Sequence, residues 1–314
     1  KHSSNNMIDF IKVRKITYWI SGALVLIAWI SLIIFGLKPG MDFTGGSALE
    51  LKLNNVNIDH QFITDVYKQF GYQNISIAPS GDDGLTIRST DITEENHQKI
   101  ITQIKEKYNE VEEMRFESFG PVIGRELRNK SIQGIILVVI CIVLYLSYAF
   151  RQVSRPMASW HYGVTAILSL IHDISIPTGL FAILGHVHGV EIDSNFIVAL
   201  LVILGFSVHD TIIVFDRIRE KLRTHPGLDF GQVMNESINE TLRRSIFTSL
   251  TLVLVLLALL IFGPASLFYF TLTLLIGTFF GTYSSIFIAS PLLYDWYLFL
   301  QKRKNKKQGE IKKR

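Results

Sequence analysis

Long apolar stretches alternate with short polar ones along most of the chain, and six of the apolar stretches are long enough to cross a bilayer. About 30 Å of hydrocarbon requires about 20 apolar residues in a helix. The first stretch is longer than the core of a signal peptide, so we predict that it is an uncleaved span. The six predicted spans are Ile16–Leu37, Ser131–Phe150, Tyr162–Gly185, Asn195–Phe215, Ser245–Phe262 and Leu267–Ser290.

Lys and Arg residues lie on alternate connections between these spans. They occur before the first span, between the second and third, between the fourth and fifth, and after the sixth, whereas Gly185–Asp193 and Gly263–Ser266 contain none. Because cytoplasmic loops retain Lys and Arg, we predict that both termini are cytoplasmic. The predicted order is a cytoplasmic N-terminus (1–15), a first span (16–37), a periplasmic domain (38–129), five further spans (130–295) with a cytoplasmic loop at 216–244, and a basic cytoplasmic tail (296–314).

The segment 38–129 has the pattern of a soluble fold, with 15 acidic residues against 10 basic ones. Its periodicity predicts the order strand, helix, strand, strand, helix, strand, which is typical of a ferredoxin-like domain. So small a domain buries a modest core and leaves little room for a catalytic cleft. The predicted elements are Gly46–Leu53, Asp59–Phe70, Asn74–Ala78, Leu85–Thr90, Thr93–Tyr108 and Glu112–Phe119, with a turn at Ser80–Gly84. The predicted fold class is therefore a polytopic α-helical membrane protein with an α+β extracytoplasmic domain.

Composition and motifs exclude several classes of protein. Apolar residues make up 48% of the chain and charged residues only 18%, which excludes disorder and an ordinary soluble enzyme. A net charge of +4, concentrated next to apolar segments, predicts no nucleic-acid partner. The chain has no P-loop, dinucleotide fingerprint, HExxH, CxxC or nucleophile elbow, so we predict no catalytic residue, cofactor or metal site. An ion gradient remains as the available energy source, and the glycine-rich segment Asp42–Ser47 is interpreted as a tight turn into the first strand.

Three ionisable residues in or beside the spans require an explanation, because a charge within the bilayer costs about 2.5–3.5 kcal/mol on insertion scales. Asp173 lies near the middle of the third span, Asp210 near the cytoplasmic end of the fourth, and Arg244 at the start of the fifth. We predict that these three residues form a proton pathway. A carboxylic acid releases its proton more readily beside a guanidinium than among apolar groups, so movement of Asp210 relative to Arg244 would load and unload a proton.

Helical spacing places these residues on polar stripes. Arg244, Thr248 and Thr251 share one helical face, and Ser207 precedes Asp210 by one turn. We predict that the two stripes face each other and admit water.

Structural interpretations of the same residues stay open at this point. Arg244 is equally typical of a cation that anchors a span at the surface, and Asp210 of a static partner between helices. Asp173 lies four residues before Pro177, whose missing N–H frees a backbone carbonyl, so a structural role is a second possibility for it.

Two further features favour packing roles. His172 and His209 adjoin the acids in sequence but point about 100° away on a helix, which favours packing histidines over proton carriers. The pattern of Gly277 and Gly281 is typical of close contact between helices.

The chain resembles the SecF subunits of the SecD/SecF family of protein-export membrane proteins, within the RND superfamily. The ordered combination of motifs covers nearly the whole chain. It consists of MDFTGGSALEL (41–51), FGPVIGRELRNKSIQG (119–134), IHDISI (171–176), GFSVHDTIIVFDRIREKLR (205–223) and SINETLRRSIFTSLT (237–251).

This resemblance implies half of an RND-type bundle in a bacterial inner membrane, which pairs with SecD and assists the SecYEG channel and its associated subunits. The pair would use the proton motive force to promote late translocation of a preprotein. The Asp and Arg that family members use in spans four and five map onto Asp210 and Arg244, and the Asp of the span-three HD pair maps onto Asp173. His209 departs from the Asn expected before the span-four Asp. Anionic lipids are the further predicted partner, in contact with the basic tail.

Two other functions remain as alternatives. An RND-like exporter of lipids or small hydrophobic molecules would be expected to have a second repeat and a larger external domain, and this sequence has neither. A passive scaffold of the translocase would require neither Asp210 nor Arg244.

Overall fold

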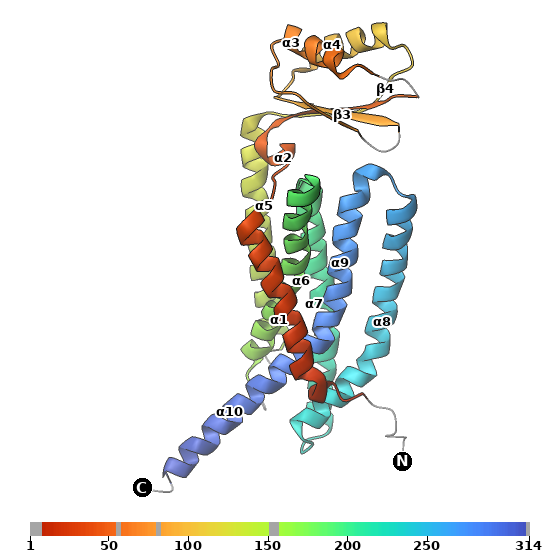
Figure 1. Cartoon of the computed structure of the whole chain (residues 1–314). Helices are drawn as coiled ribbons and strands as arrows, with labels where there is room; N and C mark the ends of the chain where they lie inside the picture. Colours follow the sequence, from red (N-terminus) through yellow and green to blue (C-terminus); the bar gives the residue numbers. More distant parts are fainter. Residues whose placement is uncertain (1–7, 55–57, 80–82, 151–156, 312–314) are drawn as a thin grey trace. The chain divides into compact units, whose positions relative to one another are not determined.

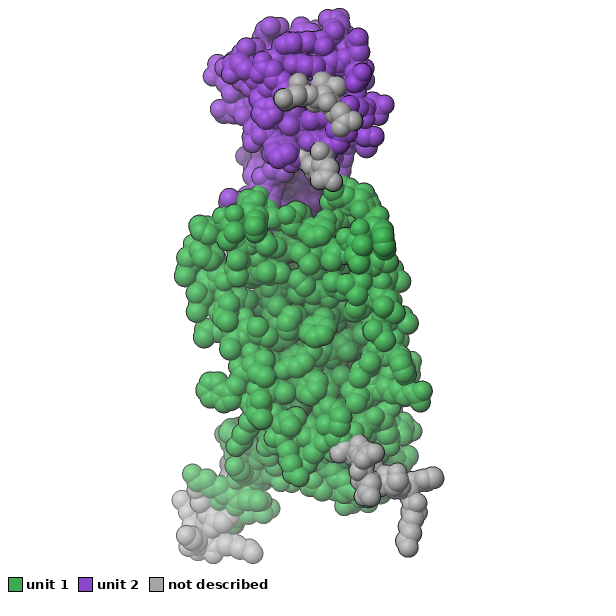
Figure 2. Space-filling view, turned by 45° about the vertical axis from the view of Figure 1, so that its right-hand side comes forward, with its two compact units in different colours: residues 1–37, 135–190, 198–314 green, residues 38–134, 191–197 purple. Residues whose placement is uncertain are grey.

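The computed structural model describes residues 8–54, 58–79, 83–150 and 157–311. These residues form two compact units (Figure 2). The helical unit comprises 1–37, 135–190 and 198–314, and the α/β unit comprises 38–134 and 191–197. Several predictions lie outside the described residues. These are most of the turn at 80–84, the cations Arg151 and Arg155 between the second and third spans, and the first and last residues of the chain.

Among the described residues, six helices are long and apolar enough to cross a membrane, which confirms the predicted polytopic fold. Figure 1 shows their arrangement. The last of them combines several shorter elements, including a π-helical turn. The helices are α1 (Phe10–Phe35), α5 (Pro121–Ala149), α6 (Ser159–His188), α7 (Ser194–Thr224), α8 (Phe230–Phe262) and the series η1 (Ala265–Leu267), α9 (Phe268–Ser284), η2 (Ser285–Ala289) and α10 (Ser290–Ile311).

The segment 216–244, predicted as a loop, is mostly helical in the structure. Helix α7 continues to Thr224 and α8 already begins at Phe230, where Asp229 caps the first turn. Ion pairs support these extensions: the ammonium of Lys221 on α7 lies 2.6 Å from Glu236 and 2.8 Å from Glu240 on α8. Tertiary contacts thus continue both helices past the end of their apolar stretches.

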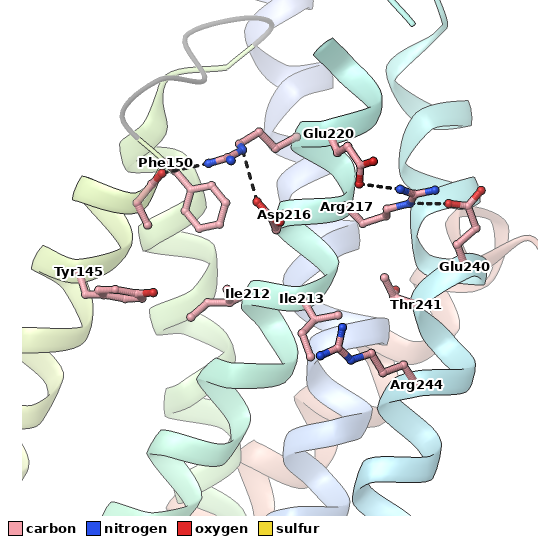
Figure 3. A pocket seen from close by; sticks show the side chains of 12 residues that line it. Tyr145, Phe150, Ile212, Ile213, Asp216, Arg217, Glu220, Glu240, Thr241 and Arg244 are labelled. Carbon is pink, nitrogen blue, oxygen red and sulfur yellow. Dashed lines mark hydrogen bonds and ion pairs between the residues drawn. The ribbon is translucent and has the colours of Figure 1, made fainter. Parts of the chain in front are cut away.

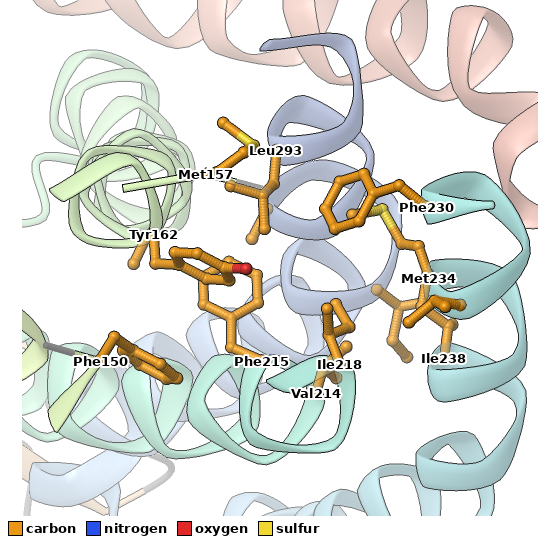
Figure 4. Packing of buried hydrophobic residues seen from close by; sticks show 14 of the residues in the cluster. Phe150, Met157, Tyr162, Val214, Phe215, Ile218, Phe230, Met234, Ile238 and Leu293 are labelled. Carbon is orange, nitrogen blue, oxygen red and sulfur yellow. The ribbon is translucent and has the colours of Figure 1, made fainter. Parts of the chain in front are cut away.

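An aromatic and aliphatic core holds α6, α7, α8 and α10 together at this end of the helical unit (Figure 4). Tyr162 of α6 stacks on Phe150 at 5.3 Å between ring centroids and meets Phe215 of α7 edge-on at 5.4 Å. Met234 of α8 and Leu293 of α10 are fully buried in the same cluster. This packing fixes the rotation of the helices that carry the polar residues described below.

The α/β unit has the predicted ferredoxin-like topology. Strands β1 (Gly46–Lys52), β2 (Ser76–Pro79), β3 (Gly84–Ser89) and β4 (Glu112–Phe119) form one antiparallel sheet in the order β2-β3-β1-β4. Helices α3 (His60–Gln69) and α4 (Glu94–Lys107) lie on the same face of the sheet (Figure 1). Leu49 and Leu51 of the sheet and Ile63, Tyr67 and Ile104 of the helices are among the buried residues of the core between them.

The segment Asp42–Ser47, interpreted as a tight turn, consists of most of the short helix α2 (Met41–Thr44), Gly45 and the start of β1 at Gly46. Gly45 has φ +82° and Gly46 has φ +139°, conformations that strain any residue with a Cβ. A Cβ on Gly45 would also lie 2.8 Å from Cα of Pro121, and one on Gly46 would lie 2.9 Å from the carbonyl oxygen of Ser89. Both positions therefore require glycine for two independent reasons.

Candidate functional site

Close contact between α9 and α7 builds the polar centre of the helical unit. A Cβ on Gly277 would lie 2.1 Å from the side chain of Ile203, and one on Gly281 would lie 3.1 Å from Cβ of Ser207. The two glycines thus allow the backbone of α9 to approach α7, as their spacing predicted. The hydroxyl side chains that follow on α9 reach both intramembrane acids as a result.

Asp173 is fully buried, and both of its carboxylate oxygens are hydrogen-bonded. Oδ2 accepts from the hydroxyl of Ser207 on α7 and, at 2.8 Å, from the hydroxyl of Ser284 on α9. Oδ1 lies 2.9 Å from Nδ1 of His172. The carboxylate therefore connects α6, α7 and α9.

Asp210 is also fully buried, but its bonding is incomplete. Its Oδ2 accepts from Thr282 of α9 at 3.2 Å and from Ser249 of α8 at 3.5 Å. Its Oδ1 has no hydrogen-bond partner among the residues that the structure describes. A buried oxygen in this condition gains more than a fully bonded one from taking up a proton or a water molecule.

The two acids belong to neighbouring parts of one network. Ser207, which bonds Asp173, precedes Asp210 by three residues on α7. On α9, Thr282 bonds Asp210 and Ser284 bonds Asp173. The π-helical turn η2 begins at the next residue, Ser285, and such turns often occur at functional sites in helices.

Arg244 lies apart from both acids, on the wall of a cavity of about 690 Å³ between α5, α7 and α8. Figure 3 shows its guanidinium extended toward Ile213 of α7. The neighbouring arginines are paired, Arg217 with Glu220 and Glu240 and Arg219 with Asp216. Within the described ranges, Arg244 has no ion-pair partner.

The face of α8 that contacts Asp210 is not the predicted polar face but the face one residue further along the helix. Arg244, Thr248 and Thr251 are exposed in this chain, so the prediction that they face Asp210 is wrong. The buried face of α8 instead carries Thr241, Ser245 and Ser249. One residue on a helix corresponds to about 100° of rotation, and the contact of Ser249 with Thr282 on α9 selects the face.

This buried stripe leads from the cavity to Asp210. Thr241 lines the cavity, Ser249 bonds Asp210, and Ser245 lies between them in the sequence. The hydroxyl of Ser245 is buried and has no partner within the part of the chain that the structure describes. The stripe therefore offers hydroxyl groups along which water molecules can bind between the cavity and the acid.

Sequence reasoning singled out the acids but missed most of their partners. His172 was interpreted as a packing residue, yet it bonds Asp173 directly. Ser249, Thr282 and Ser284 were not singled out. The unusual density of hydroxyl residues in the sequence 278–285 of a predicted span was the signal available for the two residues on α9.

The α/β unit has a buried titratable residue of its own. His97 of α4 stacks on Phe116 of β4 at 3.7 Å, and its ring nitrogens lie 3.3 Å from Glu94 and 3.0 Å from Glu113. Hydrogen bonds from Gln98 and His97 lower the pKa of Glu94, which is otherwise exposed. Among residues 8–54, 58–79, 83–150 and 157–311, no group of three or more His, Cys, Asp or Glu side chains is placed to hold a metal ion.

Comparison with family models gives two matches. Residues 99–298 match the model described as protein export membrane protein SecD/SecF, C-terminal. Residues 30–55 match the SecD/SecF GG motif, and they include Gly45 and Gly46 at the start of β1.

Relatives match along almost their whole length. Protein translocase subunit SecF of Thermobaculum terrenum is 41% identical over 303 residues, which cover 92% of this chain and 94% of the relative. Protein translocase subunits SecF of Anaerolinea thermophila and Synechocystis sp. are each 36% identical, with the same two coverages.

Solved structures of SecDF are similar in fold. The crystal structure of SecDF from Thermus thermophilus, described as a translocon-associated membrane protein, superposes with a TM-score of 0.76 at 30% identity. A SecDF structure in the super-membrane-facing form gives 0.66 at 28% identity. The chain spans 39% and 41% of the lengths of these two proteins.

Proposed function

The chain belongs to the SecD/SecF family of protein export membrane proteins, and we propose from this premise that it is the SecF-type accessory subunit of a bacterial Sec translocase. The relatives that match along nearly their full length are named protein translocase subunit SecF. The chain spans about two fifths of a SecDF protein, which supports a SecD-type subunit as the partner that supplies the rest. It acts in translocation without catalysing a covalent reaction.

The chain resides in the bacterial inner membrane with both termini in the cytoplasm. The distribution of Lys and Arg over the connections supports this orientation. The α/β unit then lies on the periplasmic side, where an emerging preprotein is within its reach. The basic residues on the exposed part of α10 contact anionic lipids at the cytoplasmic surface; they are Lys302, Arg303, Lys304 and Lys306. The SecYEG channel is the site at which the subunit acts.

The proton motive force supplies the energy, and Asp210 carries the proton. The observation that supports this most directly is Oδ1 of a fully buried carboxylate, which has no partner among the described residues and lies next to a stripe of buried hydroxyls that begins at a cavity. A proton that crosses the membrane releases about 2.3 kcal/mol per 100 mV, and repeated cycles can drive movement of the periplasmic domain.

Arg244 acts at the other end of the stripe. Of the three arginines that line the cavity, Arg217 and Arg219 form ion pairs with carboxylates, whereas Arg244 forms none with the described residues. A movement of α8 that turns Arg244 toward α7 would bring its positive charge closer to Asp210 and favour release of the proton. Asp173, which is fully hydrogen-bonded, forms the other end of the same pathway.

The test uses proteoliposomes that contain the chain, its SecD-type partner and SecYEG, with a preprotein as substrate. Asp210→Asn is expected to remove the gradient-dependent part of translocation, so that its rate equals that of the wild type without a gradient. Asp216→Asn is the matched control, because Asp216 is on the same helix but its side chain is 59% exposed and pairs with Arg219. Full gradient-dependent export by Asp210→Asn across a pH series would mean that Asp210 is structural.

Substitution of Arg244 distinguishes a functional pair from two separate residues. Arg244→Gln is expected to impair the same step, and the double variant with Asp210→Asn is expected to be no worse than either single one. If neither substitution has an effect, while deletion of 38–129 or of the basic tail abolishes assembly, the chain is a passive scaffold. Accumulation of a small molecule but of no precursor protein on depletion would indicate an RND-like exporter.

A further inference from the structure

His172 has an unusual environment for a histidine in the middle of a bundle. It is 4% exposed, and its Nδ1 lies 2.9 Å from Oδ1 of Asp173. Its Nε2 is buried and has no hydrogen-bond partner among the described residues. When Asp173 is ionised, Nδ1 donates to its carboxylate, and in the neutral ring Nε2 then carries a lone pair and is free to accept a proton.

The ring is not enclosed by apolar side chains alone. Phe280 and Tyr283 of α9 lie 6.1 and 6.2 Å from it between ring centroids. The hydroxyl of Tyr283 accepts a hydrogen bond from Ser21 of α1 at 3.2 Å. Asp173 and Tyr283 are thus the titratable groups that the described contacts place next to the ring, and α1 contributes a hydroxyl.

The partners of Asp173 are able to accommodate either protonation state. The hydroxyl proton of Ser284 has two acceptors within reach, Oδ2 of Asp173 at 2.8 Å and the carbonyl oxygen of Gly281 at 3.0 Å. A proton that binds at Oδ1 leaves Oδ2 able to accept from Ser207 and Ser284 as before. Protonation of the carboxylate at Oδ1 therefore requires no buried donor to lose its partner.

We propose that His172 is a proton-carrying residue that delivers protons to Asp173. A proton binds at Nε2 of His172, and the proton on Nδ1 passes to Oδ1 of Asp173. The ring is neutral again, with its proton on Nε2, and the carboxylate has become a carboxylic acid. The pair is reset when Asp173 gives up its proton on the side of the network where Ser207 lies, and the neutral ring rotates so that an N–H again faces Oδ1. The proposal rests on the proposed function, because it adds a group to the proton pathway that includes Asp210.

Two substitutions separate proton transfer from mere positioning of Asp173. An Asn side chain at 172 places an amide near the position of Nδ1 and retains a hydrogen bond to Asp173, but it does not titrate. A Gln side chain places its amide near the position of Nε2 and does not titrate either. His161→Asn is the matched control: His161 is on the same helix and 5% exposed, but it stacks on Trp160 and bonds the carbonyl oxygen of Ala158.

The measurement is proton conductance of the complex with the SecD-type partner in proteoliposomes, between pH 5 and 8, where an ordinary histidine changes its charge. His172→Asn and His172→Gln are each expected to lower the conductance about tenfold or more, since positioned proton-transfer groups commonly contribute about 10²–10⁴-fold. Both are also expected to flatten its dependence on pH, whereas His161→Asn retains the wild-type profile.

The outcomes distinguish this proposal from the proposed function. Wild-type conductance and pH profile in His172→Asn would show that the histidine only positions Asp173, and the proposal would be wrong. If His172→Asn does not assemble with the partner, His172→Gln is used instead. Wild-type conductance and pH profile in that variant would likewise show that the proposal is wrong. Loss of conductance in Asp210→Asn together with normal conductance in the His172 variants overturns this inference alone, whereas normal conductance in Asp210→Asn overturns the proposed function.

Discussion

At the scale of single residues, the two buried acids differ in how completely they are bonded. Within the part of the chain that the structure describes, Asp173 has partners on both oxygens, whereas Asp210 has partners on one. A partly bonded carboxylate has room for a proton or for water at its free oxygen, whereas a fully bonded one gains a proton only when a bonded donor gives one up, as proposed for His172. The two residues were placed together in one predicted pathway, but their surroundings support different roles within it.

Tyr67 in the α/β unit allows a prediction about pH. Burial, helped by the nearby Glu113, raises the pKa of the Tyr67 phenol above its usual value of about 10. The unfolded chain therefore loses this proton at a lower pH than the folded chain does. The contribution of Tyr67 to stability is complete below about pH 10 and falls as the pH rises toward the folded-state pKa.

Titration of the phenolate absorbance tests this prediction. In wild type, Tyr67 is expected to ionise only when the chain is unfolded by denaturant at alkaline pH. Tyr67→Phe should reduce the absorbance gained on unfolding by the equivalent of one tyrosine. An unchanged gain would show that the phenol of Tyr67 is already ionised in the folded protein.

At the scale of elements, the contact of α9 with α7 positions the polar network. The donors to both acids on α9 depend on the approach that Gly277 and Gly281 allow. A Cβ at position 277 would meet three side-chain carbons of the buried Ile203 within 2.9 Å. A larger residue there has to separate the helices or force Ile203 out of its rotamer.

Gly277→Ala is accordingly expected to destabilise the helical unit by about 1–3 kcal/mol, the usual cost of overpacking a core. It should also impair proton conductance, because Thr282 and Ser284 move away from the acids. Gly205→Ala on α7 is the control, since a Cβ there meets no atom of the described residues within 4 Å. The measurement is the Tm of the purified protein in detergent.

A compensating change makes this prediction specific. Ile203→Ala removes the atoms that the new Cβ would meet, so the double variant with Gly277→Ala should recover part of the lost Tm. Equal melting temperatures for Gly277→Ala and Gly205→Ala would contradict a tight α7–α9 contact.

At the scale of the whole molecule, the six helices differ in how much of their apolar surface this chain covers. The apolar windows of α6 and α7 are 56% and 50% buried, whereas those of α5 and α8 are 6% and 17% buried. Lipid or another protein has to cover the remainder. A chain with the length of about two fifths of SecDF is expected to present part of this surface to a partner subunit.

Binding of a SecD-type partner should therefore raise the Tm of the chain. A partner present at about 100 times its Kd stabilises the folded state by about 2.7 kcal/mol. The measurement compares the chain alone, the chain with the partner, and the chain with an unrelated membrane protein at the same concentration in the same detergent. A Tm that does not respond to the partner would mean that lipid covers these faces.

The sequence alone was sufficient for the six spans, the order of strands and helices in the α/β unit, the turn at Gly45 and Gly46, and the close contact at Gly277 and Gly281. These features depend on the length of an apolar stretch, on its periodicity or on a local backbone conformation, all of which neighbouring residues determine. The identity of the buried acids followed as well, because the cost of charge in a bilayer applies to each residue separately.

The tertiary structure decided which side chains meet. Adjacent residues on a helix point about 100° apart, so a small rotation of α8 determines whether Arg244 or Ser245 faces the acids. Packing of Ser249 against Thr282 of α9 places Ser245 on the buried face. Helix packing also brought His172 and Asp173 into the centre of the bundle beside Ser207 and Ser284. Rotation and approach of helices depend on contacts between residues far apart in the chain, which no local pattern contains.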